Sequence, residues 1–431
     1  MNVLVIGGGG REHALAHALS SSPSVARVYA APGNDAMAAH ATLLPAGDYL
    51  AAAREAQADL IVIGPEQPLV AGVADELRAA GFTVFGPGKH AAQLEGSKAF
   101  AKAFMHRHAL PTARWYHVHS LAEAIARVRE FPVPVVLKND GLAAGKGVTI
   151  HDTHASAEDR LAEYYAANPD QELVIEEFLA GIETSLLLIV NETGAAQLPL
   201  GQDYKQAFDN DEGPMTGGMG VVAPVAYPGL ATVGRDIIAP TLAGLQQDGL
   251  SFRGVLYIGL MITADGPKIL EFNVRFGDPE TQAFMPLLAT DIGVLLHDAA
   301  SGKPLPAVVP TTGGFAACII LASDGYPDAP VPGAPLTLPH EYPTAVTVYH
   351  AGSKQQIDGS FITQLPDSWG LNQKYIMLAV NNWNEEYHNI SLGGLTCDSM
   401  DYYNSEAHQF NIYLPKIETS KKQYIGFFHT G

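Results

Sequence analysis

The sequence predicts a mixed α/β and α+β protein, with a parallel α/β domain, a second unit that carries a small lid, and then a mostly β segment of foreign type. Three observations support this prediction. Short apolar strands alternate with helical stretches over residues 1–90, as is typical of parallel sheets flanked by helices. Two predicted strand pairs surround a Gly-rich loop within residues 133–190, which indicates a lid. The composition then changes abruptly after residue 354.

The strands expected in the first domain each end in a loop that contains glycine. These strands are VLVIG, RVYAAPG, LIVIGPE and TVFGP, and the glycines are Gly7–Gly10, Gly33, Gly64 and Gly86. Ligands bind at the carboxyl ends of parallel strands, so the loops are candidate ligand contacts. Gly9, Gly10 and Arg11 open a helix where backbone amides can approach a phosphate, although a tight turn without a ligand is the alternative. A nicotinamide dinucleotide is not expected, because Glu12 and His13 stand where the G-x-G-x-x-G pattern needs its third glycine.

Length, charge and cysteine content narrow the class of protein. A chain of 431 residues has room for about three domains. The formal charge of −20 argues against nucleic acid or an acidic membrane as a partner, whereas small phosphate ligands need only local amides and a few cations. The two cysteines, Cys318 and Cys397, cannot form a disulfide framework, and the first residues lack the basic region of a signal peptide. The cysteine content favours a reducing, cytoplasmic location. No apolar run reaches about 20 residues, so we expect no membrane span. We favour a monomer.

The predicted domains follow the changes in pattern. They are an N-terminal domain at 1–100, a middle domain at 101–295 with its lid at about 122–187, the start of a C-terminal domain at 296–354, and the β segment at 355–431. The last boundary rests on composition, because residues 1–354 contain 59 alanines and 7 asparagines, whereas residues 355–431 contain 2 alanines and 7 asparagines. A shift of this size indicates a last segment of different origin, through a gene fusion, a chimera or an assembly error.

Three lysines suit the phosphates of a nucleotide. Lys138 ends the predicted strand VVLK, and Lys146 follows Gly145 in a glycine-rich loop. A strand-borne lysine beside such a loop can hold phosphates and cover them. Lys98 lies 40 residues before Lys138, in the segment LEGSKAFAKAFM. One such lysine alone could be a solvated cation, so the prediction depends on the series.

Acidic residues follow the lysines at positions that suit an adenosine pocket. The backbone around Glu176, Glu177 and Leu179 can read the edge of adenine, and Glu183 can accept hydrogen bonds from both ribose hydroxyls. The alternative for an isolated acidic pair is a solvated strand edge.

One predicted strand offers a site for a divalent cation. Glu271 and Asn273 alternate with apolar residues and therefore point to the same face, which Arg275 extends. Carboxylate and amide oxygens suit Mg²⁺ or Mn²⁺. Arg275, together with Lys138 and Lys146, could neutralise charge on a transferring phosphoryl group. A structural polar ladder is the alternative.

A second glycine-rich segment, GPMTGGMG at residues 213–220, predicts a loop that shapes a substrate pocket. Its Gly217 and Gly218 can present amides, and Asp203 and Lys205 precede it. A flexible hairpin is the alternative. The histidines are scattered, and none of their spacings predicts a zinc site. The G-x-S-x-G elbow of a seryl nucleophile is absent.

Taken in order, these motifs resemble the phosphoribosylamine–glycine ligase family, also called glycinamide ribonucleotide synthetases. The resemblance covers residues 1 to about 354 and rests on the segments IGGGGREHALA, APGNDA, GPEQPLVAGV, FGP, LEGSKAFAK, LKNDGLAAGKGV, EEFLAGIE, QDYK, TGGMG, EFNVRFGDPETQ, DGYP and HAGSK. It implies a Rossmann-like N-terminal domain followed by an ATP-grasp fold with a small lid. It also implies the reaction of ATP, glycine and 5-phosphoribosylamine through glycyl phosphate to give ADP, phosphate and glycinamide ribonucleotide, a step of purine synthesis.

The resemblance implies roles for individual residues. By motif, Lys98 and Lys138 would contact ATP phosphates, Glu176–Leu179 adenine, Glu183 the ribose, and Glu271 and Asn273 Mg²⁺. The phosphate of phosphoribosylamine is a separate hypothesis from loop chemistry, which places it near Gly9–Arg11, Gly33, Asn34 and Glu66.

The sequence departs from the family at three positions near the presumed substrate loop and over its whole last segment. Tyr204, Gln206 and Met215 stand where the family has His, Arg and Asn. Residues 355–431 resemble instead the C-terminal β-domain of PLP-dependent decarboxylases of the arginine and ornithine group, with Cys397-Asp398 as the matching pair. The barrel and the PLP lysine of those enzymes are absent. The alternatives are therefore a chimeric chain that binds MgATP without turnover, another ATP-grasp carboxylate–amine ligase, or a decarboxylase fragment that acts with a partner chain.

Overall fold

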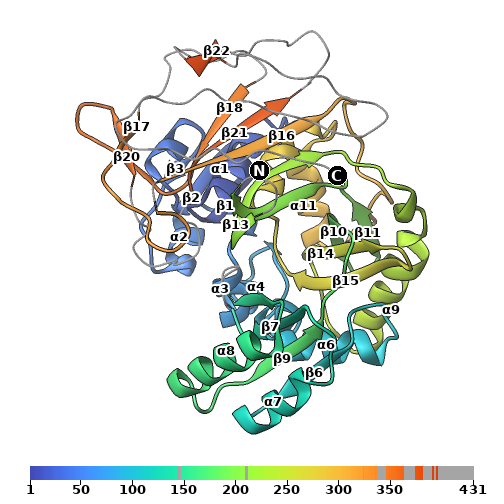
Figure 1. Ribbon diagram of the computed structural model, residues 1–431. Coiled ribbons are helices and arrows are strands. Elements are labelled where there is room, and N and C mark those ends of the chain that lie inside the picture. The colour runs from blue at the N-terminus through green and yellow to red at the C-terminus, as the bar shows by residue number, and fades with distance from the viewer. Residues whose placement is uncertain are drawn as a thin grey trace.

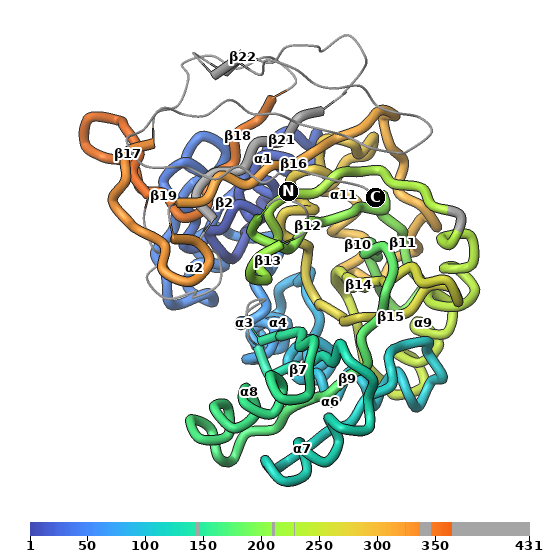
Figure 2. Tube along the Cα trace, viewed as in Figure 1, coloured from blue at the N-terminus to red at the C-terminus, as the bar shows by residue number. Residues whose placement is uncertain are grey.

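The computed structural model describes residues 1–142, 147–208, 212–323, 325–336 and 346–363, together with the backbone of strands at 374–381, 391–392 and 395–396 (Figures 1 and 2). The predicted site residues Gly145 and Lys146, and the pair Cys397-Asp398, lie outside the described residues.

The N-terminal part forms a five-stranded parallel sheet in the order β3-β2-β1-β4-β5. Its strands are β1 (Asn2–Gly7), β2 (Arg27–Pro32), β3 (Thr42–Leu43), β4 (Leu60–Ile63) and β5 (Val84–Phe85). The connections contain α1 (Gly10–Ser20), η1 (Asp35–Ala39), α2 (Tyr49–Glu55), α3 (Glu66–Ala71) and α4 (Val73–Ala79). Because β1 lies between β2 and β4, the loops after these three strands meet at one edge, where the order of strands reverses.

A small antiparallel sheet forms the lid, which stands apart at the lower end of the view (Figure 2). The lid is reached through α5 (Gln93–Gly96) and α6 (Lys98–Arg107) and consists of β6 (Trp115–Val118), α7 (Leu121–Val128), β7 (Val135–Asn139), β8 (Val148–His151), α8 (His154–Ala167) and β9 (Leu173–Glu177). The strand order is β6-β9-β7-β8. Its two helices pack on one face of the sheet over a core of their own, which includes Val118, Leu137, Leu161 and Ile175.

The second large unit is built on two antiparallel sheets. One has the order β11-β10-β14-β15, from β10 (Ile182–Asn191), β11 (Gly194–Gln197), β14 (Gly254–Thr263) and β15 (Gly266–Asn273). The other begins with β12 (Gln202–Phe208), β13 (Glu212–Ala223) and β16 (Ala316–Ala322). The helical segments around them are η3 (Pro228–Thr232), η4 (Gly234–Ile238), α9 (Ala239–Gln247), α10 (Glu280–Phe284), η5 (Met285–Leu287) and α11 (Ile292–Ala300).

The segment GPMTGGMG, predicted as a loop, belongs to strand β13. Residues 220–223 of β13 pair with β16, while the same strand pairs with β12 through two irregular steps near Tyr204 and Gln206. Before Gly220 the printed pairing of this segment is with β12 alone, and Gly213 (φ 86°) and Gly218 (φ 102°) adopt the positive φ that glycine allows at irregular steps of a ladder. The prediction of a loop is therefore wrong, and the bulged ladder explains how a strand accommodates so many glycines.

The regular elements described after residue 330 are short strands. β17 (Pro335–Leu336), β20 (Phe361–Thr363) and β19 (Ser353–Gln355) form a three-stranded sheet in the order β17-β20-β19, and β22 (Ser391–Leu392) pairs with β23 (Leu395–Thr396). β18 (Val346–His350) belongs to the sheet of β12, β13 and β16. The strand β21 (Lys374–Asn381) lies between β16 and β18 and completes the sheet order β12-β13-β16-β21-β18 (Figure 1). Within the described residues, no helix is long and apolar enough to cross a membrane.

Candidate active site

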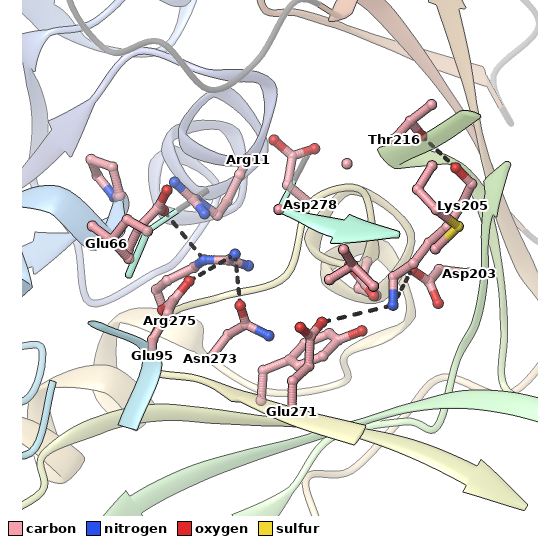
Figure 3. Close-up of a pocket in the computed structure, with 18 of the residues that line it drawn as sticks. Arg11, Glu66, Glu95, Asp203, Lys205, Thr216, Glu271, Asn273, Arg275 and Asp278 are labelled. Atoms are coloured by element: carbon pink, nitrogen blue, oxygen red, sulfur yellow. Dashed lines mark hydrogen bonds and ion pairs between the residues drawn. The ribbon is translucent and has the colours of Figure 1, made fainter. Parts of the chain in front are cut away.

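A cavity of about 640 Å³ opens where the N-terminal loops, the lid and the second unit meet (Figure 3). The predicted site residues that line it are Gly9, Arg11, Gly33, Asn34, Glu66, Lys98, Lys138, Glu176, Glu177, Leu179, Glu183, Asp203, Lys205, Gly217, Glu271, Asn273 and Arg275. Two predicted residues, Gly10 and Gly218, are buried behind this surface, at the start of α1 and within β13. The described part of the chain thus gathers residues up to 266 positions apart into one site.

The glycine loops of the first sheet approach each other too closely for a side chain. A Cβ atom on Gly8 would lie 2.4 Å from the carbonyl oxygen of Gly33, and the Gly33 amide donates to the Gly7 carbonyl at 3.1 Å. The Asn34 side chain holds the loops in this position, because its Nδ2 donates to the carbonyls of Gly8 (2.9 Å) and His350 (3.0 Å). The amide of Asn34 is therefore engaged within the protein, although the residue borders the cavity.

Arg11 links the first loop to the second unit. Its Nε donates to Glu12 Oε1 at 2.5 Å, and its Nη1 donates to the Phe276 carbonyl at 3.2 Å. The other oxygen of Glu12 accepts from the Gly9 amide at 2.6 Å. Since Arg11 is 4% exposed, its guanidinium is a buried cation beside the glycine loops.

Two lysines share one buried carboxylate beneath the lid. Nζ of Lys102 lies 2.8 Å from Oε2 of Glu176, and Nζ of Lys138 lies 3.0 Å from Oε1. Burial lowers the pKa of Lys102 to about 8. Burial also raises the pKa of Glu176, but the two lysines outweigh this effect and the pKa is lowered. The cluster carries one positive charge in excess, which suits a phosphate chain.

The prediction assigned adenine to the backbone around Glu176 and said nothing of its side chain or of Lys102. The side chain of Glu176 orients the two lysines, so only its backbone is available for an adenine edge. Lys102 lies one helical turn after Lys98 on α6, so the (i, i+4) spacing put both on one face. That spacing could have identified it, but the partner on β9 was not evident from the sequence.

Lys98 begins α6 at the hinge between the lid and the first domain. Its Nζ donates to the Gly141 carbonyl at 2.8 Å, and its backbone amide donates to Asp140 Oδ1 at 2.5 Å. Burial lowers the pKa of Lys98. Asp140 thereby joins the end of β7 to the start of α6.

Lys205 is surrounded by acidic side chains (Figure 3). It forms an ion pair with Glu183, and its Nζ lies 3.6 Å from Asp203 Oδ2 and 3.8 Å from Glu271 Oε1. Burial lowers the pKa of Lys205, but Asp203 and Glu183 reverse this and raise it well above its usual value. Burial raises the pKa of Glu183 to about 7, although Lys205 partly offsets the effect. Glu183, predicted as a ribose contact, is thus paired with Lys205 here.

Asp203 has an unused hydrogen-bonding atom. Its Oδ1 is buried and has no hydrogen-bond partner among the described residues. The nearby Glu280 accepts from the Ser185 hydroxyl at 2.8 Å. A buried acceptor without a partner costs free energy, so a donor from a bound molecule would be favourable at Asp203.

Arg275 connects three elements on the other side of the cavity (Figure 3). Its guanidinium lies 3.0 Å from Glu95 Oε1 and 3.4 Å from Glu66 Oε2, and donates to Asn273 Oδ1 at 3.0 Å. Burial alone would lower the pKa of Arg275, but the carboxylates raise it. Burial raises the pKa of Glu95 to about 7. Glu95 was missed as a site residue, although it lies in the LEGSK motif just before Lys98.

Glu271 and Asn273 fit a hard divalent cation. Both line the cavity from alternate positions of β15. Burial raises the pKa of Glu271, but Lys205 and Lys138 outweigh it, so the pKa is lowered and the carboxylate stays charged. Asn273 Oδ1 accepts one hydrogen bond from Arg275 and keeps a second lone pair. Two oxygen donors beside a phosphate site suit Mg²⁺.

Comparisons with known proteins identify the family. The family description "Phosphoribosylglycinamide synthetase, N domain" matches residues 1–95, and "Phosphoribosylglycinamide synthetase, ATP-grasp (A) domain" matches residues 96–281. The chain is 42% identical over 376 residues to a phosphoribosylamine–glycine ligase of Listeria monocytogenes, covering 84% of this chain and 89% of that protein. This chain belongs to the phosphoribosylamine–glycine ligase family. A relative of the same name from Ralstonia nicotianae is 45% identical over 377 residues, again covering 84% of this chain and 89% of that protein.

Solved structures agree with this membership. The crystal structure of a phosphoribosylamine–glycine ligase from Thermotoga maritima matches with a TM-score of 0.78 and 33% identity, covering 90% of this chain and 94% of that one. Biotin carboxylase from Campylobacter jejuni matches with a TM-score of 0.67 at 15% identity, covering 88% and 87%, which shows the shared ATP-grasp fold alone. No comparison supports the predicted likeness of residues 355–431 to PLP-dependent decarboxylases, or a chimeric origin.

Proposed function

We propose that this protein joins glycine to 5-phosphoribosylamine, with ATP converted to ADP and phosphate, to give glycinamide ribonucleotide. Membership of the ligase family supports the reaction. The observation that carries the proposal is a single cavity shared by the lid lysines, the acidic group around Lys205 and the glycine loops of the first sheet. A ligase of this kind must bring a nucleotide, a carboxylate and an amine together, and this cavity borders groups for each.

We assign the ATP phosphates to Lys98, Lys102 and Lys138, because these cations line the cavity below the lid. Adenine is assigned to the backbone between Glu176 and Leu179. The ribose contact at Glu183 stays a prediction, since binding would have to compete with the ion pair to Lys205. Gly145 and Lys146 stay predictions from the sequence.

In the proposed first step, a carboxylate oxygen of glycine attacks the γ-phosphorus of ATP, and ADP leaves. Arg275 and Lys138 would hold the negative oxygens of the phosphoryl group in transit. Glu66 and Glu95 fix the Arg275 guanidinium, so its charge is oriented before the substrates bind. Mg²⁺, held by Glu271 and Asn273, would neutralise phosphate charge.

In the second step, the amine of 5-phosphoribosylamine attacks the carbonyl carbon of glycyl phosphate, phosphate leaves, and the nitrogen loses a proton. We assign the attacking amine of 5-phosphoribosylamine to Asp203, whose Oδ1 has no hydrogen-bond partner among the described residues. The phosphate of phosphoribosylamine is assigned to the amides of Gly9 and Gly33 beside Arg11. Because the Asn34 amide holds the loops together, its replacement would act through loop position.

The finer predictions on cation, location and assembly are part of the same proposal. Mn²⁺ should replace Mg²⁺, because both prefer carboxylate and amide oxygens. A cytoplasmic location agrees with a chain whose two cysteines cannot form a disulfide framework, and a monomer stays a prediction. ADP release measured with each cation checks the choice of cation, and the mass of the purified protein in solution checks the monomer.

The deciding experiment measures ADP release from purified protein with Mg²⁺, ATP, glycine and freshly made 5-phosphoribosylamine, with each substrate omitted in turn. We expect release only when glycine and the amine are both present, and glycinamide ribonucleotide among the products. ATP binding is measured separately. Binding without turnover would contradict the proposal and leave a nucleotide-binding chain, while turnover with another carboxylate would point to a different ATP-grasp ligase.

A further inference from the structure

The lid carries a cluster of metal-ligating side chains on the side of β6 and β9, apart from the residues that line the cavity. His117 lies on β6, His119 follows it, and Glu172 precedes β9. Nε2 of His117 lies 2.8 Å from Oε2 of Glu172, and Nδ1 of His119 lies 3.2 Å from Oε1. The two imidazole rings are 4.3 Å apart. One ligand atom from each residue lies within 4.8 Å of the other two.

Strand geometry accounts for this cluster. Val118 is fully buried in the lid core, so its neighbours His117 and His119 point to the opposite face of the sheet, which also carries Lys138 and Glu176. The strands β6 and β9 are antiparallel neighbours, with Val118 opposite Leu173 (Figure 1). Continuing this register by one residue sets Glu172 opposite His119. The His-Val-His spacing is evident in the sequence. The third ligand, Glu172, lies more than 50 residues later, just before β9, and only the fold shows that it is close.

The backbone at Glu172 is anchored as well. Its carbonyl accepts hydrogen bonds from the Asp140 amide at 3.3 Å and from the Tyr164 hydroxyl at 3.2 Å. The third ligand therefore stands on a fixed part of the lid, and only side-chain rotation is needed to bring the three donor atoms together.

We propose that His117, His119 and Glu172 form a zinc-binding site at the β6 edge of the lid sheet, on the face opposite the lid helices. Imidazole nitrogens with one carboxylate are a zinc donor set, held at roughly 2.0–2.2 Å in a tetrahedron with water in the fourth position. The donor atoms need to draw together by about 1 Å to reach that geometry. Mg²⁺ is not the cation for this site, because it prefers oxygen ligands and keeps its water. The site is independent of the proposed function.

Zinc would join β6 to the segment that leads into β9, whose Glu176 borders the cavity. Since an ion that binds only the folded chain stabilises it by mass action, zinc should raise the unfolding temperature of the lid. The competing explanation is a carboxylate that accepts hydrogen bonds from two histidines with no ion present.

The test is calorimetric titration of the full chain with Zn²⁺, in saturating MgADP and without a histidine tag. We expect one zinc ion per chain and a higher unfolding temperature. His117→Ala and His119→Ala should each weaken zinc binding by more than the roughly 10–100-fold that loss of a supporting hydrogen bond costs at metal sites. Glu172→Gln keeps the size and a hydrogen-bonding oxygen but loses the charge, so it should also weaken binding.

His106→Ala is the matched control, because His106 is an exposed histidine on α6, outside the cluster. It should bind zinc as the wild type does. Visible absorption of Co²⁺ as a zinc substitute should show tetrahedral coordination in the wild type and the control only. Absence of saturable zinc binding would overturn the proposal, and so would binding that all three cluster variants retain, because the ion would then lie elsewhere.

Discussion

Glu176 and Glu177 are adjacent in β9, yet their side chains lie in opposite environments. Glu176 is 2% exposed and neutralises Lys102 and Lys138, whereas Glu177 pairs near the surface with Arg114, whose side chain is 63% exposed. The alternation of a strand produces this contrast within two residues. It also makes the pair a matched test of which carboxylate supports the ATP site.

We predict that Glu176→Gln destabilises the fold by about 3–5 kcal/mol, because two buried ammonium groups lose their partner. ATP affinity should also fall, since the lysines are no longer oriented. The control Glu177→Gln should cost at most about 1 kcal/mol. Urea unfolding and ATP titration of both variants measure these effects. Equal losses in the two variants would show that the buried cluster has no special role.

The buried carboxyl of Glu95 predicts a pH dependence of stability. Burial raises the pKa of Glu95 from 4.5 to about 7, an effect that Arg275 only partly offsets. The folded state therefore holds the proton more tightly, so the contribution to stability is complete below about pH 4.5 and is lost as the pH rises through about 7. Glutamine resembles the protonated acid.

Glu95→Gln should accordingly become more stable relative to the wild type as the pH rises from about 4.5 to about 7. Glu177→Gln is the control of opposite sign, because hydrogen bonds from Arg114 outweigh burial and lower the pKa of Glu177, so its contribution is lost only toward acid. Unfolding free energies across this range measure both. A stability difference for Glu95→Gln that does not change with pH would refute the assignment.

At the scale of elements, Asp140 connects the lid to the rest of the molecule. Its Oδ1 accepts from the backbone amides of Lys98 (2.5 Å) and Ala99 (3.2 Å), and its Oδ2 accepts from the Ser97 hydroxyl at 3.0 Å. A side chain at the end of β7 thus caps the N-terminus of α6, some 40 residues earlier. This contact fixes the lid against the helix that carries Lys98 and Lys102.

Asp140→Ala should cost about 1 kcal/mol, as the loss of a helix cap usually does. It should also raise the KM for ATP, because the lid and the lysines of α6 lose their common anchor. Asp48→Ala is the matched control, since Asp48 caps α2 by accepting from the Ala51 amide at 2.8 Å, away from the cavity. That variant should lose similar stability with no change in KM. A shared effect on KM would mean that stability alone is responsible.

The parallel α/β class of the first domain and the positions on single strands could be predicted, whereas partners across elements could not. Alternation alone indicated that Glu271 and Asn273 share a face, and both line the cavity. The ion pair of Glu183 with Lys205 was not predictable, because β10 and β12 lie in different sheets. The extended form of GPMTGGMG was missed for a similar reason. Pairing with β12 places the segment in a strand, and the irregular steps of that pairing accommodate Gly213 and Gly218 at positive φ.

At the scale of the whole molecule, the last segment supports the site from a distance. β21 pairs with β16 on one side and with β18 on the other. β18 in turn reaches the glycine loops, because the His350 carbonyl accepts from Asn34 Nδ2 at 3.0 Å and the His350 amide donates to His13 Nδ1 at 3.0 Å. The strand at 374–381 therefore supports the loops proposed to bind the substrate phosphate, although it lies outside the region that matches the family descriptions.

A chain that ends after Thr363 should lose this support. Without β21, one edge of β16 and one edge of β18 have no strand partner, so we expect aggregation and a lower unfolding temperature. In the soluble fraction, ATP affinity should persist, because the predicted ATP contacts precede residue 281. The KM for 5-phosphoribosylamine should rise more than the KM for ATP, since β18 no longer holds Asn34.

The matched control is a chain that ends after Asn381 and so keeps β21. Size-exclusion chromatography, thermal unfolding and the two KM values, measured on both truncated forms, separate the contribution of this strand from that of the segment beyond it. If the two forms behave alike, the pairing of β21 does not support the site. If only the shorter form loses its affinity for 5-phosphoribosylamine, β21 supports the site although it lies outside the residues that match the family descriptions. The physical reason is that sheet pairing depends on backbone hydrogen bonds more than on side-chain identity.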